Sequence, residues 1–318
     1  MPIPTAPLIP LYQPAPVTRE ALDYADLAII DLRNFATTAE ERGKLALQVR
    51  EAMSSQGFFY VIGHGYSSEQ MKRMFDIADV PFSRVSHDEK EKYLASTKQA
   101  GSFQGYKLRQ YWHIDNGVLD QVETYNIHRD VSSRAHPEAL RPLLPEIDQF
   151  ARHSHINVLG PILRLMALGL ELPEETLLDM HRWDGDSETY LRYMKYFPRS
   201  AEDEQKTKNV WLKGHNDIGT ITLLYSQPVS ALQILARDGT WKWVKHIDNA
   251  ILAPLAASPV LQRLGIKRRF EKDEDAPVMA EWRKARTAAY GQSILSKSSE
   301  ETDIEQKVIQ GVVVKHYS

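Results

Sequence analysis

Residues 211–225 read WLKGHNDIGTITLLY, with His215 and Asp217 two positions apart at the centre. In an extended segment successive side chains point to opposite faces, so residues i and i+2 share one face. His215 and Asp217 can therefore bind one cation from one side of a strand end. From Thr220 to Tyr225, β-branched and apolar residues follow a period of two, which predicts a strand.

One histidine and one carboxylate supply two ligands of the facial triad that holds non-haem Fe(II) and leaves positions open for O2 and a co-substrate. The third ligand is expected to be a second histidine. Downstream of Asp217 the sequence contains only His246 and His316. His246 follows a predicted hairpin strand, which would have to turn toward the metal, and His316 would have to fold back from the last strand.

The composition is that of an ordinary globular protein. With 318 residues, 42% hydrophobic and 25% charged, the chain can bury a large core as one big domain or two smaller ones. A net charge of −3 gives no basic surface for nucleic acid or a membrane. The sequence shows no signal-peptide pattern and no apolar run of membrane-spanning length, and it has no cysteine. We expect a cytoplasmic enzyme acting on a small molecule, and the sequence leaves its oligomeric state open.

Local patterns predict a mixture of helices and strands. Residues 1–20 are rich in proline and predict an extended arm, and residues 100–130 are aromatic and irregular, which suits a loop folded over a core. Expected strands are 27–32, 58–62, 190–198, the hairpin 231–235 with 241–244, and 312–314; expected helices are 40–56, 67–82, 86–93, 138–170 with a break at Pro161, and 252–290. Residues 296–306 are polar and predict a loose segment.

Several motifs occur in a specific order. Residues 57–65 read GFFYVIGHG, residues 120–126 read DQVETYN, a strand ends in Tyr-Phe-Pro at 196–198, and the hairpin carries Gly-x-Trp-x-x-Val at 239–244. Together with His-Asn-Asp at 215–217, they resemble the isopenicillin-N-synthase-like Fe(II)/2-oxoglutarate oxygenases. Each motif alone is weak, but their order and spacing over residues 20–251 make the resemblance specific.

The resemblance implies an α+β fold built on a double-stranded β-helix, or jelly roll. It divides the chain into an N-terminal non-haem dioxygenase-type region (1–184, strands plus helices), a partial jelly-roll domain (185–251) and a helical C-terminal tail (252–318).

The resemblance also implies Fe(II) held by His215 and Asp217, with 2-oxoglutarate as co-substrate and O2 as oxidant; no catalytic residue is expected beyond the metal ligands. Arg192 and Lys195 flank the site and can hold a carboxylate, with solvated edge charges as the alternative interpretation. Tyr196 stands where relatives place groups near the co-substrate, and core packing explains it about as well.

The sequence departs from the family after the hairpin. In the family a Gly-Asp strand follows, then a His-Arg-Val strand with the distal ligand, then an Arg-x-Ser strand for 2-oxoglutarate. Here residues 249–251 run directly into Leu252-Ala253-Pro254, which resembles the family's C-terminal tail, and no Arg-x-Ser occurs downstream of Asp217. We infer an internal deletion between Ile251 and Leu252, from a skipped exon, a gene-model error or decay. Such a jelly roll would be incomplete and would have unpaired strand edges.

Other histidines have structural interpretations. His64, between two glycines, is predicted to be a turn residue, and His153, His155 and His181 are predicted to be ordinary helix residues.

The leading functional hypothesis is an oxygenase-family protein whose inherited chemistry is hydroxylation, desaturation or cyclisation of a small molecule, as in secondary metabolism. Without a third ligand it should bind iron weakly and turn over slowly. The alternatives are an oxidase subtype that uses no 2-oxoglutarate but still needs the second histidine, a non-catalytic truncated isoform or remnant acting as a binding scaffold, and a cupin-like binding module.

Overall fold

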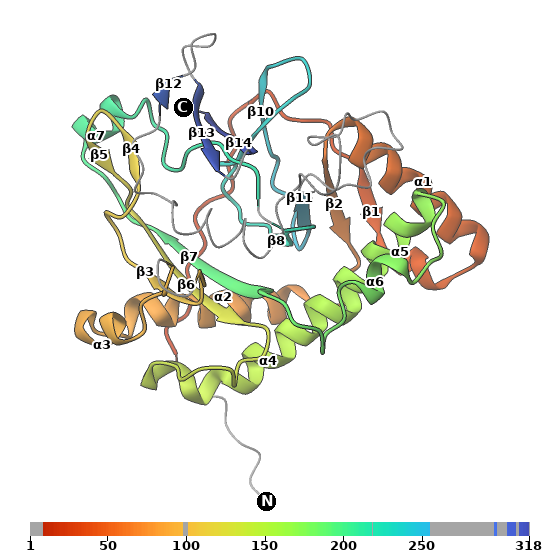
Figure 1. The fold of residues 1–318 in the computed structure, drawn as a ribbon, viewed down its shortest axis with the longest axis horizontal. Coiled ribbons are helices and arrows are strands. Elements are labelled where there is room, and N and C mark those ends of the chain that lie inside the picture. Colours follow the sequence, from red (N-terminus) through yellow and green to blue (C-terminus); the bar gives the residue numbers. More distant parts are fainter. Residues whose placement is uncertain are drawn as a thin grey trace, which may run out of the picture.

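A computed structural model describes residues 9–97, 101–217 and 219–254, together with three C-terminal strands. Its helices are η1 (Leu32–Ala36), α1 (Ala39–Ser55), α2 (Ser68–Ser83), α3 (His87–Lys92), η2 (Glu138–Leu143), α4 (Leu144–His153), η3 (Ser154–Leu159), α5 (Gly160–Gly169), α6 (Thr176–Asp179) and α7 (Ala201–Lys206). Its strands are β1 (Ile29–Asp31), β2 (Phe58–Ile62), β3 (Gly105–Lys107), β4 (His113–Asp115), β5 (Val118–Leu119), β6 (Val122–His128), β7 (Tyr190–Tyr196), β8 (Leu224–Tyr225), β9 (Gln233–Leu235), β10 (Trp241–Trp243), β11 (Ile251–Pro254), β12 (Ser296–Lys297), β13 (Ile304–Ile309) and β14 (Val312–Tyr317). This mixture confirms the expected α+β class (Figure 1).

In one sheet, with the order β1-β2-β11-β8, the two central strands β2 and β11 are buried on both faces. Strand β1 runs parallel to β2, and β11 pairs antiparallel with both β2 and β8. Because side chains alternate along a strand, Phe59 and Val61 pack with residues of α1 and α5, whereas Tyr60 packs on the opposite face with Ile234 of the β9–β10 hairpin. Strand β11 contains Ile251 and Leu252, between which the sequence analysis infers a deletion, and it lies between β2 and β8.

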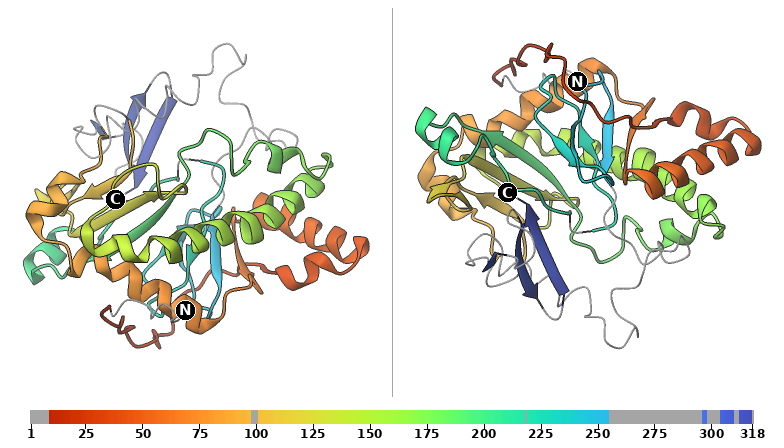
Figure 2. Two further views of the ribbon diagram at one scale, coloured as in Figure 1. Left: turned by 90° about the horizontal axis from the view of Figure 1, so that it is seen from below. Right: turned by 90° about the horizontal axis from the view of Figure 1, so that it is seen from above.

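A second sheet, in the order β3-β6-β7, separates a core from the candidate site. Tyr106, Tyr125 and Tyr193 stand opposite one another across the three strands and pack into a core with residues of α2, η2 and α4. The other face carries Asn126 and Arg192, which are also cross-strand neighbours. The rod of α4 and α5 runs past both sheets, with α1 at one end of the molecule and α7 at the other (Figure 2).

The predicted helix 138–170 is a continuous rod with one π-helical turn, η3, between α4 and α5. Pro161 does not break it, contrary to expectation. The π turn widens the backbone immediately before Pro161, which accommodates the proline ring and its missing N–H.

Several strand and loop predictions are wrong. Residues 101–130 contain β3 to β6, and β6 is a buried central strand, whose Tyr125 and Ile127 pack in the helical core. The strand expected to start at Thr220 is shorter and covers only Leu224–Tyr225. It is short because only these two residues pair with β11.

The predicted C-terminal helices are wrong for the residues that the structure describes. Residues 252–254 are part of β11, and 296–297 and 304–309 are strands β12 and β13 where a loose segment was expected. The expected strand at 312–314 is confirmed as part of β14, which pairs with β13. Residues 255–295, the rest of the expected helical region, lie outside the described residues.

Across the described ranges, every helix is too short or too polar to cross a membrane.

Candidate metal-binding site

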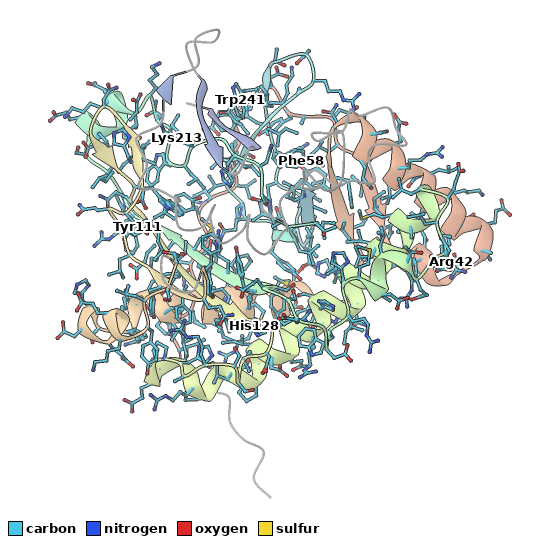
Figure 3. The ribbon with its side chains drawn as sticks, viewed as in Figure 1. Arg42, Phe58, Tyr111, His128, Lys213 and Trp241 are labelled. Carbon is cyan, nitrogen blue, oxygen red and sulfur yellow. The ribbon has the colours of Figure 1, made fainter. Side chains whose placement is uncertain are left out.

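His215 is oriented by the carbonyl two residues before it. Its Nδ1–H donates to Lys213 O at 2.8 Å, because a carbonyl can only accept. This hydrogen bond leaves Nε2 facing Asp217 Oδ1 at 3.4 Å, with a lone pair in the neutral ring and an N–H donor in the protonated ring, and both side chains are about one third exposed. Lys213 is visible in Figure 3 on the side of β7 away from α2 and α4. The sequence expectation that His215 and Asp217 face each other agrees with this geometry.

The carboxylate of Asp217 is held at its other oxygen. Thr222 Oγ1–H donates to Oδ2 at 2.6 Å, so Oδ1 remains available. Burial by itself would raise the pKa of Asp217, but hydrogen bonds from His215 and Thr222, with the nearby charge of Arg192, hold it below its usual value. The hydrogen bond to Asp217 raises the pKa of His215, although burial opposes this.

The donor pair fits a divalent cation. An imidazole nitrogen and a carboxylate oxygen each bind a transition metal at about 2.1 Å, so two such bonds at about 90–110° place the donor atoms about 3.0–3.4 Å apart. The observed separation of 3.4 Å lies in that range. Nitrogen and oxygen donors suit Fe(II).

A third ligand does not join this pair among the described residues, where no group of three His, Asp or Glu side chains could hold a metal. His246 is engaged elsewhere, with Nδ1 at 2.7 Å from the hydroxyl of Ser226. The side chain of His316 lies outside the described residues.

Arg192 and Tyr196 share the face of β7 that is directed toward this pair. Arg192 donates through Nε to Asn126 Oδ1 at 2.8 Å and through a terminal nitrogen to Tyr190 OH at 3.0 Å. Its charge acts on both His215 and Asp217. Tyr196 is 47% exposed, so its ring is not a core residue.

Lys195 is not brought to the site. It points to the opposite face of β7 from Arg192, because neighbouring residues on a strand alternate, and its ammonium pairs with Asp79 of α2 at 2.5 Å. We therefore correct the expectation that Lys195 contacts a co-substrate.

Comparison with known proteins adds to this geometry. Residues 27–146 match the family model described as the N-terminal part of the non-haem dioxygenase in morphine synthesis. A 2-oxoglutarate-Fe(II) type oxidoreductase of Emericella nidulans is 26% identical, over 76% of this chain and 70% of the relative. The flavonol synthase/flavanone 3-hydroxylase of Petunia hybrida is 25% identical, over 76% of this chain and 66% of the relative. These matches make the chain similar to 2-oxoglutarate–Fe(II) oxygenases over about three quarters of its length.

Solved structures share the fold of this chain. A full-length Neurospora crassa protein in complex with alpha-KG matches with a TM-score of 0.61 at 17% identity, over 75% of this chain and 77% of the Neurospora protein. JOX2 in complex with 2OG, Fe and JA matches with a TM-score of 0.55 at 23% identity, over 80% of this chain and 71% of JOX2.

Three residues beside the candidate site were not predicted from the sequence to have a role there. Thr220 and Thr222 were interpreted only as strand residues, and His181 as a helix residue. His181 instead follows α6 in a turn and contacts the hydroxyl of Thr220 through Nε2 at 2.8 Å. The spacing of two threonines three and five residues after Asp217 was the available signal, but the same spacing is common in ordinary strands.

His64 has the structural role that its sequence predicts. Nε2–H donates to Asn249 O at 3.0 Å, and Nδ1 accepts from the Tyr66 backbone N–H at 3.4 Å. Both ring nitrogens are thus occupied by the backbone of two loops.

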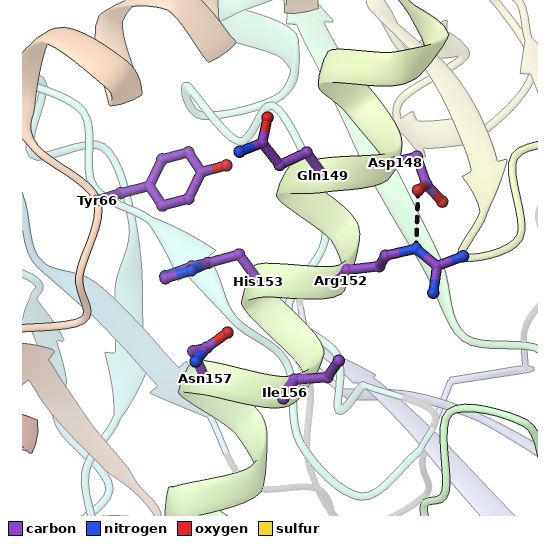
Figure 4. A pocket seen from close by; sticks show the side chains of 7 residues that line it. All are labelled: Tyr66, Asp148, Gln149, Arg152, His153, Ile156 and Asn157. Atoms are coloured by element: carbon purple, nitrogen blue, oxygen red, sulfur yellow. Dashed lines mark hydrogen bonds and ion pairs between the residues drawn. The ribbon is translucent and has the colours of Figure 1, made fainter.

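A groove of about 390 Å³ lies elsewhere, along α4 and η3 (Figure 4). Its lining includes Tyr66, Gln149, His153 and Asn157, none of which was expected in a site. His153 donates through Nε2 to His64 O at 2.7 Å, which ties the groove wall to the β2–α2 loop.

Proposed function

We propose that this chain is an oxygenase-family protein that binds a divalent metal weakly through His215 and Asp217. The observation that carries the proposal is the 3.4 Å separation of Nε2 and Oδ1. Each side chain is oriented by a further hydrogen bond, from His215 to Lys213 O and to Asp217 from Thr222. Such outer contacts fix ligand orientation in metal sites.

The substrate side of the proposal is a small molecule oxidised with O2 and 2-oxoglutarate. Fe(II), when bound, supplies the activation of O2 that organic side chains cannot provide. Arg192 is the cation available to hold a carboxylate of 2-oxoglutarate, because it lies on the site face of β7 and forms no ion pair that the described residues show. Tyr196, on the same face, would line the pocket.

We further propose that the chain lacks the segment that carries the distal histidine and the Arg-x-Ser in relatives. Ile251 and Leu252 would flank the deletion, and both are buried in β11. The incomplete ligand set predicts low turnover, because two protein ligands hold a metal less firmly than three.

A second candidate function is a non-catalytic binding scaffold. It is favoured by one observation: within the described residues, His215 and Asp217 have no third metal-binding partner. The two candidates differ in whether metal and 2-oxoglutarate bind at all.

The decisive experiment is an anaerobic Fe(II) titration with 2-oxoglutarate, following the metal-to-ligand charge-transfer absorption, with succinate release measured after O2 is added. Asp217→Asn is the test variant. Asp238→Asn is the matched control, because Asp238 is in the β9–β10 turn, where it accepts hydrogen bonds from Thr240. We expect an absorption band that saturates only at high Fe(II), is lost in Asp217→Asn and is unchanged in Asp238→Asn, with slow succinate release.

Other outcomes would reject parts of the proposal. A band of equal strength in Asp217→Asn would place the metal elsewhere. Tight binding with rapid succinate release would reject the incomplete ligand set. A folded wild-type protein without any band would favour the scaffold.

A further inference from the structure

The π-helical turn η3 carries two consecutive polar side chains, Ser154 and His155, that reach out of the helical rod. Single π turns inside α-helices are rare and often occur at functional sites. Ser154 contacts the segment from Asp217 to Tyr225 directly, and His155 contacts it through His181. This segment contains Asp217, one of the two candidate metal ligands.

The first connection runs from Ser154 to Tyr225. Ser154 Oγ–H donates to Phe150 O at 2.8 Å, which uses its only proton. The hydrogen bond of 2.7 Å between the two hydroxyls is therefore donated by Tyr225 OH to Ser154 Oγ. Tyr225 lies in β8, so this contact holds the end of the segment.

The second connection runs through His155 and His181 to Thr220. His155 Nε2–H donates to the carbonyl of His181 at 2.8 Å. His181 Nδ1–H in turn donates to Leu177 O at 2.7 Å, so its Nε2 can only accept, and it accepts the Thr220 hydroxyl proton at 2.8 Å. This contact holds the beginning of the segment, three residues after Asp217.

The backbone between these two points forms no helix or longer strand before β8, although Ile221 is a bridge residue and packs with Leu223 against the core. Gly219 has a φ of 121°, a region that favours glycine, and a Cβ there would meet no atom within 4 Å. The Thr222 N–H donates to Pro254 O at 3.2 Å, and β8 itself is only two residues long. Side-chain contacts at both ends therefore have a large share in fixing where Thr222, and with it Asp217, is placed.

We propose that η3 is a positioning element for the candidate metal site, acting through Ser154 and through His181, which His155 of η3 holds at its carbonyl. The two contacts fix Thr220 and Tyr225, and Thr222 between them orients Asp217 toward His215. The part of this inference that concerns metal binding rests on the proposed function. The part that concerns the placement of residues 217–225 is independent of the proposed function.

The test compares Thr220→Val with Thr220→Ser, which keeps the hydroxyl, and with Thr240→Val. Thr240 is the matched control, because its hydroxyl also donates to a side chain, that of Asp238, but in the β9–β10 turn. The first readout is amide hydrogen exchange of residues 211–225 without metal. We expect about 2- to 10-fold faster exchange in Thr220→Val, the change that the loss of one hydrogen bond produces, and wild-type exchange in the other two variants.

The second readout is the affinity for Co(II), followed by its visible absorption. We expect about 10-fold weaker binding in Thr220→Val, as for loss of an outer-shell contact, and recovery in Thr220→Ser. Ser154→Ala tests the other contact and should speed exchange at residues 224–225. This second variant also serves if Thr220→Val does not fold.

The outcomes separate the two proposals. Wild-type exchange in both Thr220→Val and Ser154→Ala would overturn the positioning role, whatever the metal does. A wild-type protein that binds no Co(II) would reject the proposed function, while the exchange data would still decide the inference. Faster exchange with unchanged Co(II) affinity would overturn the link between η3 and the metal site.

Discussion

In the described chain, His64, His136 and His155 are buried and share one hydrogen-bond arrangement. Each donates Nε2–H to a backbone carbonyl, and burial lowers the pKa of all three below the usual value for histidine. His136 also accepts at Nδ1 from Tyr125 OH, at 2.7 Å. A second proton on such a ring would have to displace a hydrogen bond or be buried unpaired.

The first prediction is a loss of stability in weak acid. Because the folded pKa values lie below the unfolded value of about 6.5, the unfolded chain binds more protons as the pH falls. The free energy of unfolding should therefore decrease as the pH is lowered from about 7.5 to about 5.5. Urea denaturation at the two pH values measures this decrease in the free energy of unfolding.

His136→Gln should show a smaller decrease than the wild type, and the surface variant His87→Gln should show the full decrease. An equal decrease in all three proteins would contradict the role of the buried histidines.

The second prediction concerns a buried ion pair. Asp120 is fully buried, pairs with Lys107 and accepts backbone N–H bonds from Tyr111 and Val122 at 2.9 and 3.0 Å. Asp120→Asn leaves the Lys107 ammonium buried without its partner, which should cost about 3–5 kcal/mol of unfolding free energy. The double variant Lys107→Met/Asp120→Asn should lose less than Asp120→Asn alone in urea denaturation. A larger loss in the double variant would show that the charge pair is not the cause.

At the scale of elements, β11 shows how the residues around position 251 pack. Ile251 and Ala253 face the core with α1 and α5, and Leu252 faces the β9–β10 hairpin. The apolar residues 251–253 therefore suit a strand that is buried on both faces. A strand between β2 and β8 also pairs two edges that would otherwise lack partners.

The third prediction tests that strand. Leu252 is 3% exposed, so Leu252→Ala should remove about 2–5 kcal/mol of unfolding free energy through lost burial and a residual cavity. Leu235→Ala in β9 makes the same chemical change at a side chain that is 39% exposed, and it should cost much less. Equal losses in chemical denaturation would mean that β11 does not contribute to the core in solution.

At the scale of the whole molecule, two cores meet at a weakly structured site. The helical rod and the first sheet surround fully buried residues such as Val49 and Ile162, and the second sheet packs on Ile77 and Leu143. The described residues of 211–217 and 219–223 between them form no helix and no strand longer than the single bridge residues Gly214 and Ile221.

The fourth prediction is a gradient of local stability. Native-state hydrogen exchange should give opening free energies close to the global value for α5 and β2, and the lowest values for residues 211–223, because local stability follows burial and backbone pairing. The outer edges of β7 and β8, which end their sheets in the described ranges, should exchange faster than β6 and β11. Uniform exchange over all of these elements would contradict the gradient.

Sequence patterns determined the local features of this protein. The periodicity of 40–56 and the capping residue Ser67 gave α1 and α2, and the turn before Trp241 gave the β9–β10 hairpin, because helix faces, caps and turns depend on neighbouring residues. The pairing of His215 with Asp217 was predictable for the same reason, as two residues in an extended segment share a face.

Only the tertiary structure decided which distant groups meet. It placed β6 in a core, turned Leu252–Pro254 into a strand, directed Lys195 to Asp79, and brought His181 to Thr220. Each of these contacts depends on which unpaired strand edge or polar atom lies next to the residue after folding. Contact partners that are tens to hundreds of residues apart leave no periodic signal in the sequence. The spacing of the candidate ligands His215 and Asp217 is thus a local property of the sequence, whereas the residues that hold them in place come together only through long-range packing.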